Sequence, residues 1–399
     1  MKIEKIKIKN FKVFRDVEIT DLSNFSVFLG ANGAGKSTLF DVFGFLSDAL
    51  KSNIKTALNK RGGYKEVCSR GSDGPIAFEI KFRNTEAVGL RPLITYELEV
   101  GIEPGTNNPV ILKEQLRYRR GEHGAPYRFL DFSKGTGSAI TNEEEYTSKK
   151  FNEQREQQTL DSPDILAIKG LGQFQKFKAI SAFRRLLDNW YVSNFQIQDA
   201  REVRDTEYSE HLSRTGDNLA MVTKFLWENH PDIFENILDK FRKRVPGVEN
   251  VIAEETQDGR IVLKFKDGGF EDPFVSRFVS DGTIKMFAYL VLLNDPINHP
   301  LLCVEEPENY LHPDLLPELA EEFREYAARG GQVFISTHSP DFVNALQPKE
   351  LFWLTKKNGY TTITKASDNP EIKALYQEGD KLGWLWKQRY FKGSGPYNA

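Results

Sequence analysis

The segment at residues 30–38 constrains the chain most, because it reads Gly-Ala-Asn-Gly-Ala-Gly-Lys-Ser-Thr and matches the pattern G-x-x-x-x-G-K-[ST]. An apolar segment, residues 25–29, precedes it, and apolar residues at helical spacing follow it from Lys36 onward. In a strand, loop and helix of this order, successive backbone N–H groups turn inward and surround a polyphosphate. The sequence therefore predicts a phosphate-binding loop within an α/β domain.

The residue types of this loop indicate ATP and Mg²⁺ as its ligands. Lys36 supplies a point charge for the β- and γ-phosphates, and the Ser37 hydroxyl is a ligand that Mg²⁺ accepts. The start of the following helix adds the positive end of its dipole. The residues that we expect to hold the nucleotide are Gly30, Asn32, Gly33, Ala34, Gly35, Lys36, Ser37 and Thr38.

Three further polar motifs lie in the C-terminal third of the chain. An apolar segment, residues 300–304, leads into Glu-Glu-Pro-Glu at residues 305–308, and a second one leads into Ser-Thr-His at residues 336–338. A third motif, Ser-Asp-Gly-Thr at residues 280–283, opens an apolar helix. Each motif alone has an ordinary interpretation: a solvated loop, a structural histidine and a capped helix.

Beside a phosphate loop, the same residues suggest chemistry. Glu305 is placed to approach Mg²⁺, and Glu306 is placed to take a proton from the attacking water. His338 is placed to donate a hydrogen bond to a γ-phosphate oxygen. Ser280 suits a helix N-cap, and Gly282 permits close approach of another backbone.

The order of these motifs resembles that of the ABC-type ATPases of the RecF/SMC group. It is most similar to the predicted AAA-like ATPases related to the overcoming-lysogenization-defect (OLD) nucleases, of which Leu-x-x-x-Glu-Glu-Pro-Glu-x-x-Leu-His-Pro is typical. The specific resemblance covers roughly residues 1–50 and 275–345. It implies an ABC-type ATPase head that binds ATP with Mg²⁺ and closes head to tail with a second copy.

The resemblance also implies roles for single residues. Ser280 and Gly282 belong to the motif that reaches across the dimer to the γ-phosphate held by the other subunit. Glu305 stands where many relatives carry the aspartate on the side of the metal. Glu306 is the expected catalytic base, and His338 is the switch histidine. The implied catalytic residues are Glu306, His338 and Lys36, and the implied metal ligands are Ser37 and Glu305.

This sequence differs from several members of these families, and the differences narrow the class of ATPase that the resemblance implies. The transporter sequence Ser-Gly-Gly is Ser-Asp-Gly here, which argues against a transporter ATPase, and no heptad stretch is long enough for the coiled coil of SMC proteins. Too few residues follow His338 for the TOPRIM nuclease domain of OLD nucleases. The glutamine that links nucleotide to the rest of an ABC ATPase is not identifiable, and Gln115 is left unassigned.

Composition excludes several classes of protein. Lys and Arg number 54 against 57 Asp and Glu, a formal net charge of −3 that argues against a polyanion-coating protein. The longest apolar run, residues 286–293, is far shorter than the roughly 18 residues of a membrane helix, and the N-terminus lacks a secretory signal. Two cysteines, Cys68 and Cys303, suit a reducing compartment. We therefore expect a cytoplasmic protein without a membrane partner.

Strand and helix patterns predict the fold class α/β: an ABC-type head with an inserted helical and β lobe. The expected parts are residues 1–115 with the phosphate loop, 116–272 as the inserted lobe, and 273–399 with the later motifs. Short strands are expected between residues 76 and 132, a polar surface excursion at 133–162, and helices from about 174 to 245. The last part alternates helices at 281–293, 313–328 and from Ser339 with strands at 300–305, 332–336 and 350–355.

The sequence leaves three cellular roles open for this ATPase. The favoured one is the ATPase subunit of a bacterial anti-phage system that controls a separately encoded nuclease or toxin. The second is a RecF-like DNA-repair ATPase, for which basic runs at 117–120 and 240–244 are candidate DNA contacts. The third is a nucleotide-gated scaffold with little hydrolysis. An aromatic tail, residues 382–391, either docks on its own core or meets a partner.

Overall fold

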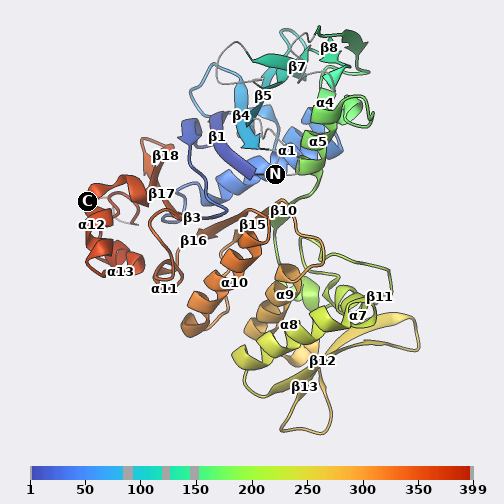
Figure 1. Cartoon of the computed structure of the whole chain (residues 1–399), viewed down its shortest axis with the longest axis vertical. Helices are drawn as coiled ribbons and strands as arrows, with labels where there is room; N and C mark the ends of the chain where they lie inside the picture. The colour runs from blue at the N-terminus through green and yellow to red at the C-terminus, as the bar shows by residue number, and fades with distance from the viewer. Residues whose placement is uncertain (1, 84–92, 119–125, 144–151, 396–399) are drawn as a thin grey trace.

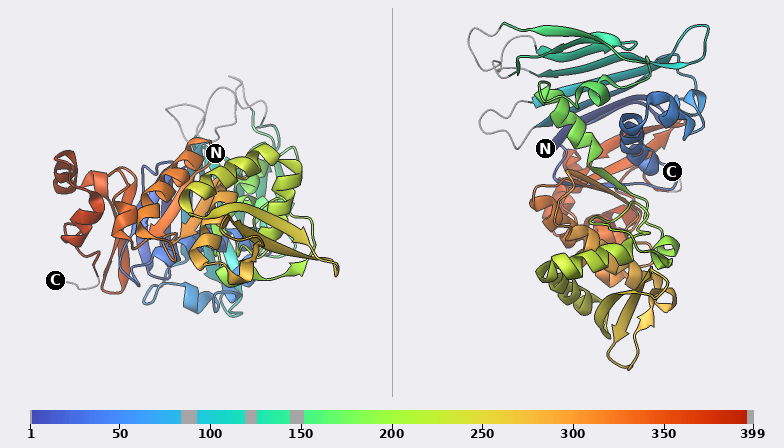
Figure 2. Two further views of the ribbon diagram at one scale, coloured as in Figure 1. Left: turned by 90° about the horizontal axis from the view of Figure 1, so that it is seen from below. Right: turned by 90° about the vertical axis from the view of Figure 1, so that its right-hand side faces the viewer.

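The structure is a computed structural model that describes residues 2–83, 93–118, 126–143 and 152–395. Its strands form two large sheets and a small one, which we name sheets A, B and C. Figures 1 and 2 show sheet A at one end of the molecule, sheet C at the other end, and sheet B between them. Sheet B is therefore the central layer, and both ends of the molecule are built against it.

Sheet A has eight strands, each antiparallel to its neighbours. Its strands alternate apolar and polar residues, so that one face is buried; in β4, Phe78 and Ile80 are buried, whereas Glu79 between them is partly exposed. The strand order is β2 (Phe14–Ile19), β1 (Lys2–Phe11), β4 (Ile76–Arg83), β5 (Leu93–Ile102), β6 (Pro109–Tyr118), β7 (Tyr127–Ser133), β8 (Thr136–Ile140) and β9 (Arg155–Thr159).

Sheet B brings together three segments that are far apart in the sequence. Val27 of one strand lies opposite Ile335, and Ile335 lies opposite Val304, all in parallel register. Because the carboxyl ends of parallel strands meet at one edge of a sheet, the residues that follow these three strands converge there. The strand order is β10 (Trp190–Ser193), β15 (Leu301–Glu305), β16 (Val333–Thr337), β3 (Phe25–Leu29), β17 (Leu351–Lys357) and β18 (Tyr360–Lys365), of which only β18 is antiparallel to its neighbour.

Sheet C and the helices around it form the lobe drawn in green and yellow in Figure 1. Its strands are β11 (Arg204–Asp205), β12 (Val248–Glu255), β13 (Arg260–Asp267) and β14 (Phe274–Val275), and the hairpin of β12 and β13 projects from the molecule (Figure 2). Its helices are α6 (Ile197–Arg201), α7 (Leu219–Asn229) and α8 (Pro231–Arg244). The lobe leads directly into α9 (Asp281–Leu293), the helix that the Ser-Asp-Gly-Thr motif opens.

The remaining helices cover sheet B or join the sheets. Those nearest the N-terminus are α1 (Lys36–Lys51), α2 (Ile54–Asn59) and α3 (Tyr64–Val67), followed by α4 (Ala167–Leu171) and α5 (Lys178–Asp188). Those nearest the C-terminus are α10 (Leu316–Ala328), α11 (Pro340–Val343), α12 (Pro370–Gln377) and α13 (Leu382–Lys387). Among the described residues, short 3₁₀ segments occur at Ser276–Phe278, Pro313–Leu315 and Ala366–Asp368.

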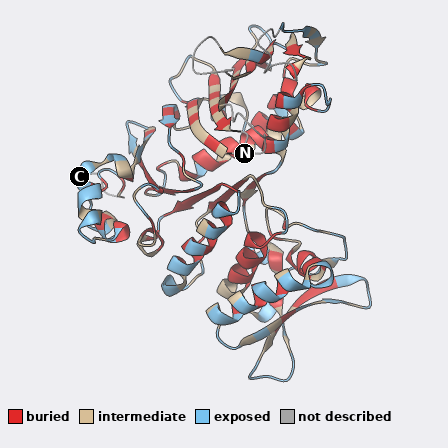
Figure 3. Cartoon of the chain, viewed as in Figure 1, coloured by how far each residue is buried: buried red, intermediate tan, exposed pale blue. Residues whose placement is uncertain are grey.

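Sheet B separates two hydrophobic cores. In β3, Phe28 packs into the core shared with sheet A and α1, whereas its neighbours Val27 and Leu29 pack into the core shared with α9 and the lobe. The strands β3, β15 and β16 at the centre of sheet B and the helix α9 are largely buried (Figure 3). Burial on both faces explains why these strands read as continuous apolar runs instead of alternating ones.

Most of the expected elements are present, and the structure differs from three expectations. The strand β10 lies within the stretch expected to be helical, where four residues between two helices, three of them buried, carry no periodic signal. The polar tract at 133–162 contains β8 and β9 at the edge of sheet A, although we expected a surface excursion. The expected boundary between residues 115 and 116 lies inside β6, so the sheet of the first part continues through β9.

The lengths of the described helices bear on whether this part of the chain contains a long coiled coil or a membrane-crossing helix. The longest described helix, α1, has 16 residues, so the described residues contain no long coiled coil. None of the described helices has the length and apolar character that a membrane crossing requires.

Two buried glutamates make the stability of sheet A depend on pH. Glu114 of β6 accepts hydrogen bonds from the backbone N–H groups of Ala167 (2.6 Å) and Ile168 (3.0 Å), at the start of α4. Glu143 accepts one from the N–H of Ala179 at 2.7 Å. Burial raises the pKa of each carboxyl to about 7, against the effect of these hydrogen bonds.

We therefore expect Glu114→Gln to change how stability varies with pH. The folded wild type keeps this proton up to a pKa of about 7, whereas the unfolded chain releases it near its ordinary value, so the unfolding free energy falls as pH rises between them. The variant should gain on the order of 2 kcal/mol relative to wild type between pH 5 and pH 8, measured by urea unfolding. Glu254→Gln, an exposed position, is the control. Parallel curves for wild type and Glu114→Gln would contradict this account.

Candidate nucleotide site

The phosphate loop between β3 and α1 has the backbone that its sequence predicts. Gly35 has a φ of 107°, and a Cβ there would lie 3.0 Å from Thr361 Oγ1 and from Val13 Cγ2, so that only glycine fits. A Cβ on Gly33 would meet nothing within 4 Å, which leaves the middle of the loop open toward solvent. The Thr361 hydroxyl donates to the carbonyl of Ala34 at 2.7 Å and fixes the loop to β18.

Lys36 is buried within this loop. Its Nζ donates to the carbonyl oxygens of Gly30 (2.7 Å) and Ala31 (3.3 Å). Burial lowers the pKa of Lys36, and the charges of the nearby glutamates oppose that shift. The ammonium group is therefore held by carbonyls at the mouth of the loop, where phosphate oxygens are better partners for it.

The two expected metal ligands lie in direct contact. Ser37 at the start of α1 donates a hydrogen bond of 2.6 Å to Oε2 of Glu305 at the end of β15. Burial raises the pKa of Glu305, and the bond from Ser37 acts against this rise. Mg²⁺ prefers a few oxygen ligands from protein and takes the others from phosphates and water. This hydroxyl and this carboxylate therefore fit Mg²⁺ that is bound together with nucleotide.

Glu306 and His338 also meet at this edge of sheet B. Nδ1 of His338 lies 3.2 Å from Oε1 of Glu306, and the amide of Asn309 donates to the other carboxylate oxygen at 3.1 Å. Glu306 has a φ of 45°, which is unusual for a residue with a side chain, and its N–H donates to the carbonyl of Ser336 at 2.9 Å. Unusual backbone geometry of this kind concentrates at functional sites.

Glu308 is a site residue to which the sequence analysis gave no role. Its Oε1 accepts hydrogen bonds from Thr337 Oγ1 (2.7 Å) and from the N–H of His338 (2.8 Å), so it joins the loop after β15 to the end of β16. Its Oε2 is buried and, among the described residues, has no hydrogen-bond partner. The signal that could have found it is the third acid of Glu-Glu-Pro-Glu.

The Ser-Asp-Gly-Thr motif lies at the N-terminus of α9, where Ser280 caps the helix and accepts from the N–H of Thr283 at 3.2 Å. A Cβ on Gly282 would lie 2.6 Å from the carbonyl oxygen of Tyr310, so this position requires glycine. Asp281 pairs with Arg201 of α6 at 2.6 Å, which ties the motif to the lobe. Within the described residues, no hydrogen bond joins Ser280 to the phosphate loop of its own chain.

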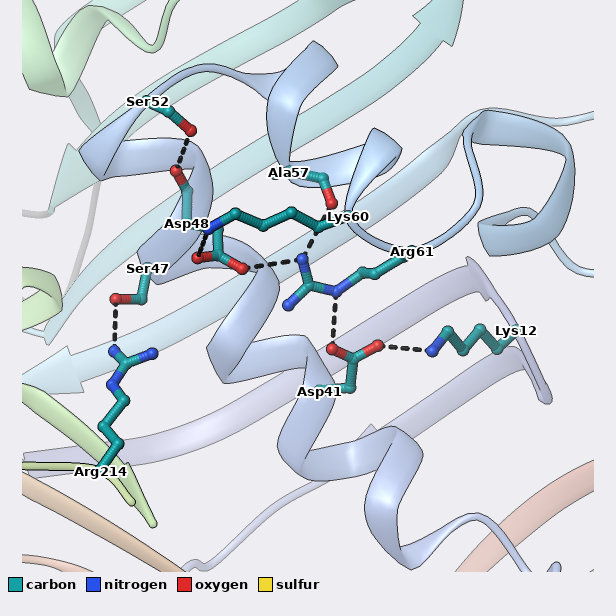
Figure 4. A network of polar contacts seen from close by, with 9 residues as sticks. All are labelled: Lys12, Asp41, Ser47, Asp48, Ser52, Ala57, Lys60, Arg61 and Arg214. Atoms are coloured by element: carbon teal, nitrogen blue, oxygen red, sulfur yellow. Dashed lines mark hydrogen bonds and ion pairs between the residues drawn. The ribbon is translucent and has the colours of Figure 1, made fainter. Parts of the chain in front are cut away.

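Polar contacts anchor α1, the helix that follows the phosphate loop (Figure 4). Asp41 of α1 contacts Lys12 and Arg61, each at 2.6 Å, and Asp48 contacts Arg61 at 2.9 Å and Lys60 at 2.8 Å. The partners come from the β1–β2 turn and from the segment after α2. The network therefore fixes the helix whose N-terminus points toward the expected phosphates.

The basic runs of the sequence are largely neutralised. Lys240 and Arg244 reach Glu322 at 2.6 and 2.7 Å, and Arg242 pairs with acids of its own helix. Arg117 pairs with Glu97, and residues 119–120 of the other run lie outside the described residues. These ion pairs leave less positive charge for phosphates of DNA than the sequence suggested.

The aromatic tail docks on its own core, which was one of the two expected outcomes. Phe391 is buried, with its ring centroid 5.2 Å from that of Trp353. The helix α13 packs so closely on α11 that a Cβ on Gly383 would lie 1.9 Å from the carbonyl oxygen of Pro340. Trp384 of α13 nevertheless remains 46% exposed.

This fold and site define an ABC-type P-loop ATPase of the RecF/SMC/OLD group. The chain belongs to the family described as "AAA domain, putative AbiEii toxin, Type IV TA system", whose model matches residues 25–344.

Two curated relatives support the assignment. The chain is 22% identical to an ATP/GTP phosphatase of Helicobacter pylori (strain ATCC 700392 / 26695) over 348 residues, 86% of this chain and 87% of that protein. It is 24% identical over 202 residues to the Old nuclease of Escherichia phage P2, a match that spans 42% of this chain and 33% of the nuclease.

Solved structures confirm the fold. An SmcHead bound to the C-winged helix domain of ScpA has a TM-score of 0.56 and 14% identity, with 91% of this chain and 97% of that one covered. An Smc head domain with an extended coiled coil from Pyrococcus furiosus has a TM-score of 0.50 at 14% identity, with 95% and 99% covered. The expected ABC-type head is therefore correct.

Proposed function

We propose that the chain binds ATP with Mg²⁺ and hydrolyses it at the carboxyl edge of sheet B. The observation that carries this proposal is the convergence of Ser37 with Glu305, and of Glu306 with His338, at distances of 2.6 and 3.2 Å beside one phosphate loop. These four side chains lie at or just beyond the carboxyl ends of β3, β15 and β16, which pair in parallel, so the arrangement is a property of the fold.

In the proposed reaction, the loop N–H groups and Lys36 hold the phosphates, and Ser37 and Glu305 are the protein ligands of the metal. Mg²⁺ held by these two residues would neutralise part of the negative charge of the phosphates. Glu306 takes a proton from water as the water oxygen bonds to the γ-phosphorus and the bond to the β-phosphate oxygen breaks. His338 orients the Glu306 carboxylate through Nδ1, and its other ring nitrogen would donate to a γ-phosphate oxygen. The rate enhancement comes from the positioning of the reacting groups and from the stabilisation of charge in the transition state.

We also propose that two copies close head to tail, so that Ser280 and Gly282 complete the site of the partner copy. The exposure of Ser280 supports this arrangement, and so does the finding that, among the described residues, it forms no hydrogen bond with the phosphate loop of its own chain. Phe278 and Phe274, next to the motif, are 76% and 40% exposed. A second copy that covers them would remove this apolar surface from water.

Among the three cellular roles, we favour control of a separate effector, a nuclease or toxin, within a bacterial anti-phage system. The similarity to the Old nuclease, of which this chain matches a third, supports this choice. Trp384 supplies a candidate docking side chain, because α13 packs on the helix that directly follows His338 and Ser339. The N–H of Trp384 donates to Oδ1 of Asn344 at 3.1 Å, which fixes α13 beside α11.

The test is copurification of the tagged Glu306→Gln protein from its native host, in the presence of ATP. We expect a stoichiometric protein partner that is lost in Glu306→Gln/Trp384→Ala and retained in Glu306→Gln/Trp227→Ala, where Trp227 is a matched tryptophan, 60% exposed. DNA alone, held only by the ATP-bound form, would contradict this role and favour the repair clamp. A slow wild-type ATPase with a permanent partner would favour the scaffold.

A further inference from the structure

Lys285 is a buried charge that the site described above does not use. It lies in the first turns of α9, and only 5% of its surface is exposed. The described residues place no carboxylate within 4.0 Å of its Nζ, although Glu306 and Glu308 are near enough to act on its charge. Burial lowers the pKa of Lys285 to about 8. A buried ammonium without a paired carboxylate is unfavourable for folding, so this lysine calls for a functional explanation.

The partners of Lys285 are a carbonyl and two aromatic rings. Its Nζ donates to the backbone carbonyl of Glu306 at 3.3 Å, and it lies 5.6 Å from the ring centroid of Tyr289 and 5.7 Å from that of Tyr310. Aromatic faces stabilise a cation without forming a salt bridge with it. Because no salt bridge engages it, the ammonium group of Lys285 can bond to the backbone carbonyl of Glu306, the expected catalytic base.

The Glu306 carbonyl is held on both sides. It accepts from the N–H of Asn309 at 3.2 Å, which closes the turn after β15, and from Lys285 on α9. Glu306 has a φ of 45°, a strained conformation for a residue with a side chain. Such a conformation persists only where its surroundings fix it, and Lys285 is a side chain from outside the turn that bonds to the backbone of this residue.

The same loop meets α9 at a second point. The carbonyl of Tyr310 lies 2.6 Å from where a Cβ of Gly282 would be, so the loop packs against the first turn of the helix. Gly282 is expected to face the nucleotide of the partner copy. The start of α9 is expected to contact the nucleotide of the partner copy. It therefore packs against the loop that carries Glu306, the expected base for the nucleotide of its own copy.

We propose that Lys285 is a positioning residue: it holds Glu306 in its hydrolytic orientation and ties that orientation to α9. This inference deepens the proposed ATPase function and rests on it. Lys285 does not touch the nucleotide in this account, so its loss should affect the hydrolytic step much more than the binding of ATP.

Steady-state ATP hydrolysis by Lys285→Met tests the proposal. Methionine keeps most of the stem but removes the donor and the charge. We expect kcat to fall 10- to 100-fold, KM for ATP to stay within threefold, and Lys285→Arg to recover at least tenfold over the methionine variant. The matched control is Lys365→Met, because Lys365 also donates to a backbone carbonyl (Asp21, 2.7 Å) and lies 5.6 Å from a phenylalanine ring centroid. This control should match wild type.

Amide hydrogen exchange without nucleotide is the second readout, and it does not depend on activity. We expect the amides of Asn309 and Leu311 to exchange about tenfold faster in Lys285→Met, and those of β16 to exchange as in wild type. Unchanged kcat together with unchanged exchange would overturn the role of Lys285. A wild type without ATPase activity would overturn the proposed function instead, and the exchange data would still decide whether Lys285 holds this loop.

Discussion

Glu306→Gln protein is expected to bind ATP with wild-type affinity and to hydrolyse it at least about 100-fold more slowly. Glutamine keeps the size of the side chain and its hydrogen bond to Asn309, but it cannot take a proton from water. The His338 contact at 3.2 Å would then orient a group without basicity. Phosphate release under saturating ATP measures the loss, and equilibrium titration with a fluorescent ATP analogue measures the binding.

Glu325→Gln is the control for this variant. Glu325 is an exposed acid on α10 that lies 3.8 Å from Lys240, outside the site, and its substitution should leave both measurements unchanged. If Glu306→Gln hydrolysed ATP at more than a third of the wild-type rate, another residue would have to be the base.

Lys36→Ala should weaken ATP binding at least about 100-fold, the second large effect. Lys36 is the one cation within the phosphate loop, and its Nζ already lies against the loop carbonyls of Gly30 and Ala31. Charge-assisted hydrogen bonds to phosphate are about twice as strong as neutral ones, and the site is partly buried. Calorimetric titration with ATP and Mg²⁺ measures the change.

Lys349→Ala, at an exposed position beyond α11, is the matched control and should bind ATP as wild type does. Retention of tight ATP binding by Lys36→Ala would place the nucleotide away from the phosphate loop. Thermal unfolding without ligand should be similar for both variants, which separates a loss of binding from a loss of fold.

The sequence predicted those parts of the site that lie in short continuous motifs. The phosphate loop, Glu305, Glu306 and His338 each follow an apolar strand, and the parallel pairing of these strands accounts for their convergence. The order of the motifs carried the resemblance to known ATPases, and that resemblance implied the roles of Glu305, Glu306 and His338. It also supplied the role of Ser280, which the geometry of a single chain does not reveal.

Long-range contacts account for what the sequence could not predict. Lys285 lies in an apolar helix and reads as an ordinary charged residue, because nothing local indicates that the carbonyl of Glu306 is beside it. Arg201 is equally unmarked, although it holds Asp281 and so explains the aspartate in Ser-Asp-Gly. The strand β10 shows the same limit, since its place in sheet B depends on β15 and not on its own four residues.

The sedimentation of Glu306→Gln protein with ATP and Mg²⁺ tests the central claim most directly, namely that nucleotide closes two copies around shared sites. We predict a monomer with ADP and a dimer with ATP. The added substitution Ser280→Arg should keep the protein monomeric while each copy still binds ATP. A protein that stays monomeric with ATP, or a dimer that forms equally well with Ser280→Arg, would contradict the account.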